Sequence, residues 1–288
     1  MRELEAILVG FDERPMARDG LALGALLART CGAALVVVRV VGKHDDDGAE
    51  EKLEREVAAA LPDPPGQVQT VLSRGKPAWQ VLRDIARTDE RIGAIALGST
   101  HRGGLGRVLP GGTAEHLLGA APCALAVAPR GYGGKPDGSP ITTEPLRVLE
   151  VGYDGSRGAS VALDLAADIA SGAGATLRVI AVGRPVMPAA APDLPPPPPL
   201  PGDDLQSKLH EVVARLDPEL RALPIYEHGD PAFRLLDRAD EGVDMLVVGS
   251  SSVGRLGTVV LGSTSRTLIE SAPCPVVVAP RPDSGDAG

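Results

Sequence analysis

The chain has 288 residues, about twice the size of the most common protein domains, so its length predicts two domains. Hydrophobic residues make up 43% and charged residues 23%, a balance typical of folded globular proteins and unlike that of disordered chains. The net charge of −9 argues against a general binder of nucleic acids or anionic membranes, because both depend on cationic patches, but it is compatible with a local phosphate site.

Strand-like and helix-like segments alternate through the first 130 residues. The pattern predicts, in chain order, a strand at about 4–11, a helix at 15–30, a strand at 34–41, a helix at 49–60, a strand at 67–73, a helix at 77–87, a strand at 93–98, a glycine loop, a helix at 112–119 and a strand at 124–128. Apolar runs such as Val36–Val38 and Met245–Val248 are typical of strands covered on both faces. The alternation therefore predicts a doubly wound α/β domain around a parallel sheet.

The second half of the chain repeats the first. Matching segments occur in the same order: Leu8–Asp12 with Glu150–Asp154, Gly75–Trp79 with Gly229–Phe233, Gly98–Gly111 with Gly249–Gly262, and Ala121–Arg130 with Ala272–Arg281. Such order predicts two tandem copies of one domain. We expect a first α/β domain over 1–130, a Gly/Pro-rich linker over 131–146, and a second α/β domain over 147–288.

The second copy carries an extra proline-rich stretch over residues 184–204. It contains five consecutive prolines, Pro195–Pro199, which cannot form a helix or a central strand. We interpret the stretch as an exposed polyproline II loop; a ligand for a proline-binding partner is the alternative.

The N-terminal sequence and the cysteines predict a cytoplasmic protein. The start of the chain has no apolar segment behind basic residues, which a secretory signal requires. Apolar stretches such as 33–38 end far short of the ~20 residues that span a bilayer, so no membrane association is expected. Cys31, Cys123 and Cys274 form no Cys-x-x-Cys pair, which fits a reducing compartment.

Two loops in each copy lie where open parallel sheets bind ligands, beyond the carboxyl ends of the strands. One loop follows the first strand at Asp12 or Asp154, and the other runs through glycines into a helix. A helix start offers unpaired N–H groups to a phosphate, glycines allow its close approach, and the aspartate can accept from an adenine or a ribose. A structural interpretation stays open, in which the glycines form turns and the Asp, Ser and Thr residues cap helices.

Taken together, these motifs resemble the universal stress protein family. The resemblance rests on the Asp-ending first strand, the Gly-x-Pro that opens the third helix, the glycine loop, and the Ala-Pro-Cys before the last strand, and it covers nearly the whole chain. It implies a five-stranded parallel sheet in the order 3-2-1-4-5 in each copy, ATP as ligand, and pairing of the two domains along their last strands. A further homodimer is compatible with this pairing.

The resemblance assigns ligand-binding positions in both copies. In the second copy it implies Gly152, Asp154 and Val182 around the adenosine and Gly249, Gly262, Ser263 and Thr264 around the phosphates. The equivalent positions of the first copy are Gly10, Asp12, Val40, Gly98, Gly111 and Thr113.

Both copies depart from the family's nucleotide motif, Gly-x2-Gly-x9-Gly-Ser/Thr. His101 and Ser252 replace the second glycine, and Gly112 stands where the first copy should have Ser or Thr. Because the first copy departs further, the second copy is predicted to bind adenine nucleotide more tightly. His101 beside Arg102 is either a plain loop residue or a cationic contact to a phosphate.

Other conspicuous residues are interpreted as structural. Asp45–Asp47 is expected to be a solvated helix start rather than a metal site. Cys123, Cys274, Trp79 and Phe233 are expected in the core. The sequence contains no convincing nucleophile–base set, so no enzyme is predicted beyond slow ATP hydrolysis.

Three functions are compatible with these observations. The first is a stress-response module whose ATP occupancy changes its conformation or its choice of protein partner. The alternative is a scaffold for protein partners that binds no nucleotide. The least favoured is an enzyme such as a slow ATPase or a nucleotidyl transferase, because the sequence has no paired acid–base residues and no His-x-Gly-His signature. We predict the first, with adenine nucleotide as the ligand.

Overall fold

The computed structural model describes residues 3–12, 14–42, 48–100, 106–134, 137, 139–183, 204–250 and 261–281. Several residues discussed above lie outside these ranges: Asp45–Asp47, His101, Arg102, Pro195–Pro199 and Ser252.

Strands and helices alternate in both copies, as predicted. The first copy contains β1 (Ala6–Gly10), α1 (Pro15–Cys31), β2 (Ala34–Val41), α2 (Ala49–Ala60), β3 (Val68–Arg74), α3 (Ala78–Thr88), β4 (Ile92–Gly98), α4 (Gly112–Leu117) and β5 (Ala124–Ala128). The second contains β6 (Val148–Gly152), α5 (Arg157–Ala173), β7 (Thr176–Gly183), α6 (Leu205–Ala214), β8 (Ala222–His228), α7 (Pro231–Asp240), β9 (Met245–Gly249), α8 (Ser263–Ser271) and β10 (Val276–Ala279).

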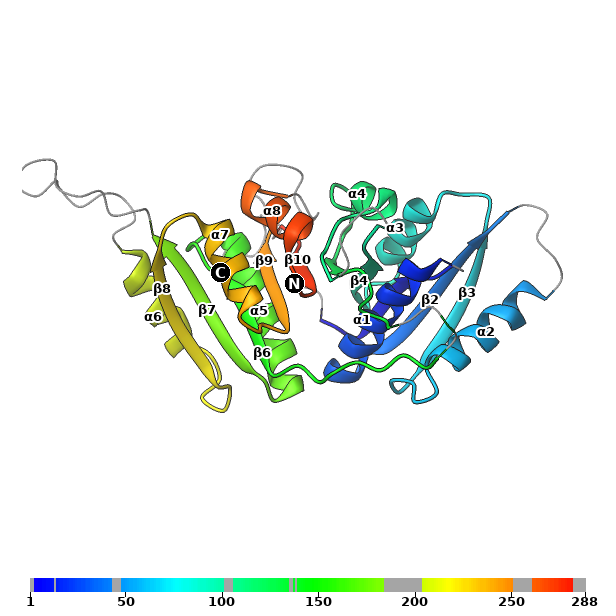
Figure 1. Cartoon of the computed structure of the whole chain (residues 1–288), viewed down its shortest axis with the longest axis horizontal. Helices are drawn as coiled ribbons and strands as arrows, with labels where there is room; N and C mark the ends of the chain where they lie inside the picture. The colour runs from blue at the N-terminus through cyan, green and yellow to red at the C-terminus, as the bar shows by residue number, and fades with distance from the viewer. Residues whose placement is uncertain are drawn as a thin grey trace, which may run out of the picture.

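The described strands form a ten-stranded sheet in the order β3-β2-β1-β4-β5-β10-β9-β6-β7-β8. Within each copy the strands are parallel and follow the predicted order 3-2-1-4-5. At the centre β5 and β10 pair antiparallel, with Val127 opposite Val276 and Leu125 opposite Val278. The two copies therefore share one sheet and lie side by side in Figure 1.

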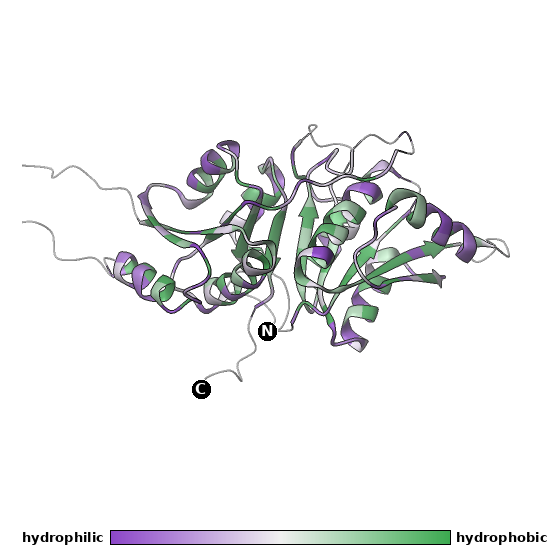
Figure 2. Cartoon of the chain, turned by 90° about the horizontal axis from the view of Figure 1, so that it is seen from below, coloured by the Kyte–Doolittle hydropathy of each residue, from purple (hydrophilic) through white to green (hydrophobic). Residues whose placement is uncertain are grey.

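Two layers of helices cover the sheet. One buried cluster lies under α1, α2, α5 and α6, and the other lies under α3, α4, α7 and α8. Ile7 and Val9 of β1 face the first cluster, whereas Leu8 faces the second. A strand buried on both faces is apolar at successive positions. Figure 2 accordingly shows hydrophobic strands between helices whose outer faces are polar.

The first turns of α1 and α5 lie against the ends of β4 and β9. A Cβ on Gly98 would collide with the carbonyl oxygen of Met16, and a Cβ on Gly249 would come within 2.6 Å of the carbonyl oxygen of Gly158. Glycine at these two strand ends is therefore required by helix–strand packing, apart from any ligand.

The linker is anchored to the first copy by the buried carboxylate of Asp19. The Oδ1 atom accepts from the N–H of Gly133 (2.8 Å) and Oδ2 accepts from the N–H of Gly131 (2.9 Å). Burial raises the pKa of Asp19, and these two hydrogen bonds oppose the shift. Further on, the N–H of Ile141 donates to the carbonyl of Ala60 (2.8 Å). The linker thus contacts α1 and the end of α2 before the chain enters β6 (Figure 1).

The core prediction was correct for the two cysteines and wrong for Phe233. Cys123 and Cys274 are buried, but the Phe233 side chain is 67% exposed. The matching Trp79 is half-buried because its ring stacks on His116 of α4, with centroids 5.0 Å apart. The equivalent residue of α8 is Thr267, which offers no ring for Phe233 to stack on.

Candidate functional site

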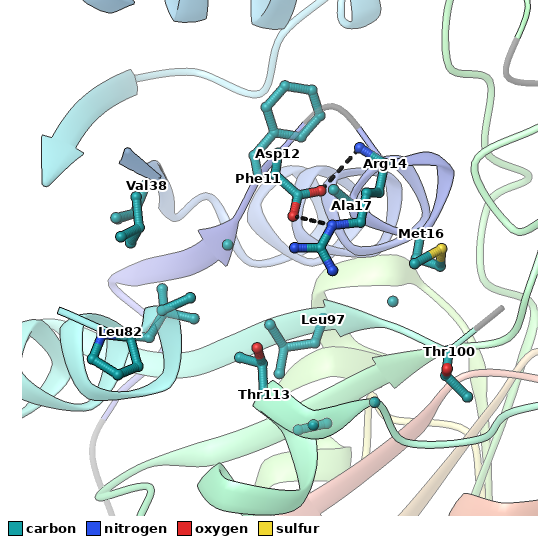
Figure 3. Close-up of a pocket in the computed structure, with 18 of the residues that line it drawn as sticks. Phe11, Asp12, Arg14, Met16, Ala17, Val38, Leu82, Leu97, Thr100 and Thr113 are labelled. Carbon is teal, nitrogen blue, oxygen red and sulfur yellow. Dashed lines mark hydrogen bonds and ion pairs between the residues drawn. The ribbon is translucent and has the colours of Figure 1, made fainter. Parts of the chain in front are cut away.

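A cavity of about 930 Å³ opens in the first copy at the carboxyl ends of β1, β2 and β4 (Figure 3). Its volume falls in the range of small-molecule sites, roughly 300–1,000 Å³. All six positions predicted for this copy line it: Gly10, Asp12, Val40, Gly98, Gly111 and Thr113. The structure thus brings together residues from β1, β2, β4 and the start of α4.

One section of the cavity wall is apolar. Val38, Leu82, Leu97 and Met16 line it, and Figure 3 shows their side chains around the opening. A Cβ on Gly10 would lie 3.1 Å from Leu82 Cδ1, so glycine keeps this part of the wall open. The apolar section carries no recognisable signal in the sequence, because its residues are scattered over four elements and resemble ordinary core positions.

Asp12 and Asp154 are not the N-caps of the helices that follow them, so the structural interpretation is wrong for these two residues. The N-caps are Arg14 for α1 and Ser156 for α5. Asp12 Oδ1 accepts from the N–H of Arg14 (2.9 Å), and Asp154 Oδ1 accepts from the N–H of Ser156 (2.9 Å). Each aspartate therefore closes a local turn two residues before the cap. In the first copy this turn holds the Asp12 carboxylate at the cavity wall (Figure 3).

The glycine loop of the first copy is closed at its base by hydrogen bonds. Ser99 donates to the carbonyl of Ala128 from both its N–H (3.1 Å) and its Oγ (2.6 Å). The N–H of Leu109 donates to Ser99 Oγ (3.0 Å), and the N–H of Thr100 donates to the carbonyl of Leu109 (2.7 Å). These bonds hold the two ends of the loop together beside the cavity.

The same loop contacts the second copy. Val108 is fully buried, and its N–H donates to the carbonyl of Ala272, just after α8 (2.9 Å). Arg107 Nη1 donates to the carbonyl of Ser271 (3.0 Å), and Arg107 Nη2 lies 3.2 Å from the Asp240 carboxylate. The cavity-lining loop of one copy is thus fixed to the end of a helix of the other.

Three charged residues that the sequence analysis did not assign also line the cavity: Arg14, Lys76 and Glu115. Arg14 Nε lies 3.0 Å from Asp12 Oδ2, and Lys76 Nζ lies 3.0 Å from Asp84 Oδ2. Hydrogen bonds from Arg83 and Lys76 lower the pKa of Asp84. The available signal was the position of Lys76 inside the Gly-x-Pro motif, since that motif opens the helix beside the cavity.

In the second copy the predicted residues occupy the corresponding ends of the elements. Gly152 ends β6, Val182 lies near the end of β7, Gly249 ends β9, Gly262 caps α8, and Ser263 and Thr264 begin that helix. The Oγ of Ser265 donates to the carbonyl of Gly249 (2.9 Å), so the first turn of α8 lies against the end of β9. Residues 251–260, which connect these two elements, lie outside the described ranges.

A buried ion pair lies on the α7-covered face of the second copy. Glu150 of β6 is fully buried, and its Oε2 accepts from Arg238 Nε (2.9 Å), whose Nη1 also donates to Glu227 Oε1 (3.0 Å). Burial raises the pKa of Glu150, and the Arg238 guanidinium opposes that shift. The first copy has Leu8 at the position of Glu150.

These features define a tandem doubly wound α/β protein. In the first copy, a ligand-sized cavity lies between β1 and β4, where the strand order reverses. In the described part of the chain, the helices are too short or too polar to cross a membrane.

The comparisons with known proteins identify the family. The model of the universal stress protein family matches residues 3–129 and 147–280, and the chain belongs to this family. A universal stress protein of Mycolicibacterium smegmatis is 30% identical over 241 residues, which cover 81% of this chain and 76% of that protein. A relative in Mycobacterium tuberculosis is 30% identical over 202 residues, and the match spans 63% of its length, less than two thirds.

A solved structure supports the fold. The crystal structure of a universal stress protein from Archaeoglobus fulgidus matches 97% of this chain and 99% of its own, with a TM-score of 0.67 at 20% identity. A putative universal stress protein from Pseudomonas aeruginosa matches with a TM-score of 0.66 at 17% identity, over 96% of this chain and 94% of its own. At these identities the matches establish the two-domain architecture alone.

Proposed function

We propose that this universal stress protein is a stress-response module that binds adenine nucleotide, with ATP as the ligand of the second copy. The observation that carries the proposal is the convergence of six predicted ligand positions on one cavity of the first copy. The cavity combines an apolar section of wall, which suits a purine, with the Asp12 carboxylate and with glycines at positions 10, 98 and 111.

The chemistry at the start of α8 supports the second copy as the better ATP site. Ser263 and Thr264 supply hydroxyl donors beside the first-turn N–H groups, whereas the first copy has Gly112 and Thr113 there. Arg266 in the fourth position of α8 adds a cation, where α4 has Glu115. A triphosphate is therefore expected to bind more tightly at α8 than at α4.

Calorimetric titration of the full chain with ATP tests the proposal, using Gly262→Asp and Gly111→Asp as a matched pair. Both glycines are N-caps with extended backbone (φ −77°, ψ 175° and φ −90°, ψ 174°), a conformation that aspartate adopts as a natural cap, so both variants are expected to fold. Each places a carboxylate where a phosphate would bind.

The native chain is expected to bind ATP. Gly262→Asp is expected to weaken this binding by at least about 10-fold, and Gly111→Asp is expected to weaken it much less. Absence of ATP binding to the native chain would refute the proposed function. Equal losses in the two variants would refute the preference for the second copy.

The exposed ring of Phe233 favours the second candidate function, a scaffold for protein partners. It is 67% exposed on α7, and exposed aromatic rings are common anchors of protein interfaces. A native chain that binds no nucleotide but loses a partner on Phe233→Ser would support this function over the first.

A further inference from the structure

The two copies carry different charges at three equivalent positions around their sites. Arg14, Lys76 and Glu115 line the first-copy cavity, and the second copy has Ser156, Asp230 and Arg266 in their places. At these three positions the first copy has cations in the loops after β1 and β3 and an anion on α4. The second copy has a neutral serine after β6, an anion after β8 and a cation on α8.

Arg14 is oriented for an anionic ligand. Its Nε is held by Asp12 (3.0 Å), and Figure 3 shows the rest of its guanidinium directed toward the cavity. Lys76 also lines the cavity, with its Nζ 3.0 Å from Asp84. Because Asp84 is shared with Arg83, this group of three side chains carries a net positive charge.

The α4 side of the first-copy cavity opposes negative charge. Glu115 lies in the first turn of α4, where its carboxylate interacts favourably with the helix dipole and competes with any phosphate. Gly112, the first residue of that helix, has no hydroxyl to donate. A phosphate chain extending toward α4 would therefore meet a carboxylate.

The second copy has no cation at the two positions equivalent to Arg14 and Lys76. Ser156 caps α5, its Oγ accepting from the N–H of Ala159 (3.2 Å). Asp230 caps α7, its Oδ1 accepting from the N–H groups of Ala232 (2.9 Å) and Phe233 (3.2 Å). A cation near the start of α8 is Arg266, whose Nη1 lies 3.9 Å from Glu270 Oε1.

We propose, resting on the proposed function, that the first-copy cavity is a site for a nucleoside monophosphate, whose phosphate binds Arg14 and Lys76, and that it discriminates against a triphosphate. A phosphate monoester carries about two negative charges at neutral pH. Arg14, Lys76 and Arg83 exceed their carboxylate partners Asp12 and Asp84 by one positive charge, so a phosphate shares these cations with the carboxylates. A triphosphate adds further negative charges that extend beyond these cations toward Glu115.

The chain contains its own reporter for this cavity. Trp79 is the sole tryptophan of the sequence and stacks on His116, with centroids 5.0 Å apart. His116 Nδ1 lies 2.6 Å from the carbonyl oxygen of Gly112, a cavity-lining residue. Ligand binding in the first copy is therefore expected to change Trp79 emission, whereas binding in the second copy is not.

The experiment titrates the full chain with AMP and with ATP, following Trp79 emission and, in parallel, heat. The test variants are Arg14→Ser, which introduces the residue of the second copy, Lys76→Gln, and Glu115→Arg. Asp230→Asn is the matched control, because it removes a charge at the equivalent position of the second copy and retains a good N-cap. Circular dichroism establishes that each variant is folded.

The expected Trp79-detected affinity is at least about 10-fold higher for AMP than for ATP. Arg14→Ser and Lys76→Gln each weaken AMP binding by about 10-fold or more, as expected for loss of a charge-assisted hydrogen bond. Glu115→Arg reduces the difference between the Trp79-detected affinities for AMP and ATP, and Asp230→Asn leaves this difference unchanged.

Two results overturn the inference alone: ATP binding detected by heat with no Trp79 response to AMP, or AMP binding that Arg14→Ser and Lys76→Gln leave unchanged. A native chain that binds neither nucleotide by either measurement overturns the proposed function together with the inference.

Discussion

Removal of the Arg238 side chain charge is predicted to destabilise the protein through Glu150. In Arg238→Met the Glu150 carboxylate loses the guanidinium that lies 2.9 Å from its Oε2. Its Oε1 has no hydrogen-bond partner among the described residues, and the side chain is fully buried. Water therefore cannot replace the lost partner without a change of structure.

The magnitude follows from the two states open to the carboxyl group. Leaving a buried charge unpaired costs about 3–5 kcal/mol. Protonating a carboxyl with an ordinary pKa near 4.5 costs about 3.4 kcal/mol at pH 7 and only about 0.8 kcal/mol at pH 5. The lower-cost state is populated, so the free energy of unfolding is expected to fall by about 3 kcal/mol at pH 7.

The pH dependence has a defined sign. Loss of Arg238 raises the folded-state pKa of Glu150 further above its unfolded value. A group with a raised folded-state pKa contributes stability that is present below its unfolded pKa and is lost as the pH rises through the folded pKa. The deficit of Arg238→Met relative to the native chain is therefore expected to be small at pH 5 and to grow toward pH 7.

Urea denaturation of the native chain and the variants at pH 5 and pH 7 measures this effect. Glu150→Leu combined with Arg238→Met is expected to recover most of the loss, because the first copy has Leu8 at this position. Arg215→Ala, which breaks an exposed pair with Glu211, is the control and is expected to change little. Equal destabilisation by Arg238→Met at both pH values, or no recovery in the double variant, would refute the reasoning.

Two further predictions concern packing and the thiols. Gly98→Ala is expected to lower the free energy of unfolding by roughly 1–3 kcal/mol, because the new Cβ collides with the carbonyl oxygen of Met16; an unchanged denaturation midpoint would contradict this. Burial raises the pKa of Cys31 to about 11 and that of Cys274 to about 12, so both thiols are expected to react slowly with a disulfide reagent at pH 8 until the chain is unfolded. Fast reaction of Cys274 in the native chain would contradict the burial of its thiol.

The fold was predictable because several independent features of the sequence indicate the same architecture. The apolar runs, the Gly and Pro positions and the internal repeat all indicate alternating strands and helices, and the strand order followed from the family resemblance. Phe233 was mispredicted because its exposure depends on α8, where Thr267 replaces the ring of His116. Trp79 and Phe233 therefore occupy the same position in two matching helices but differ in burial, because the neighbouring helix differs.

The candidate site was predictable only in part. Glycines and aspartates at strand ends are conspicuous, so the positions that line the cavity could be named. Arg14 could not, because a charged loop residue has no periodicity that distinguishes a cavity wall from open solvent, and for Lys76 the one signal was its place in the Gly-x-Pro motif. The partner of Glu150 is 88 residues away in sequence, and only the fold brings Arg238 to it. The contributions of His101 and Ser252 stay predictions.

The antiparallel pairing of β5 with β10 has a consequence for how the sites diverge. In a dimer of identical chains, every substitution appears in both subunits, so the two sites change together. Here the two halves are joined through one sheet within a single polypeptide, so a substitution can occur in one half alone. Arg14 of the first half, for example, has no matching arginine at the equivalent position of the second half, which is Ser156. Every molecule therefore carries both versions of the site in a fixed one-to-one ratio, and the two versions can diverge without a second gene product.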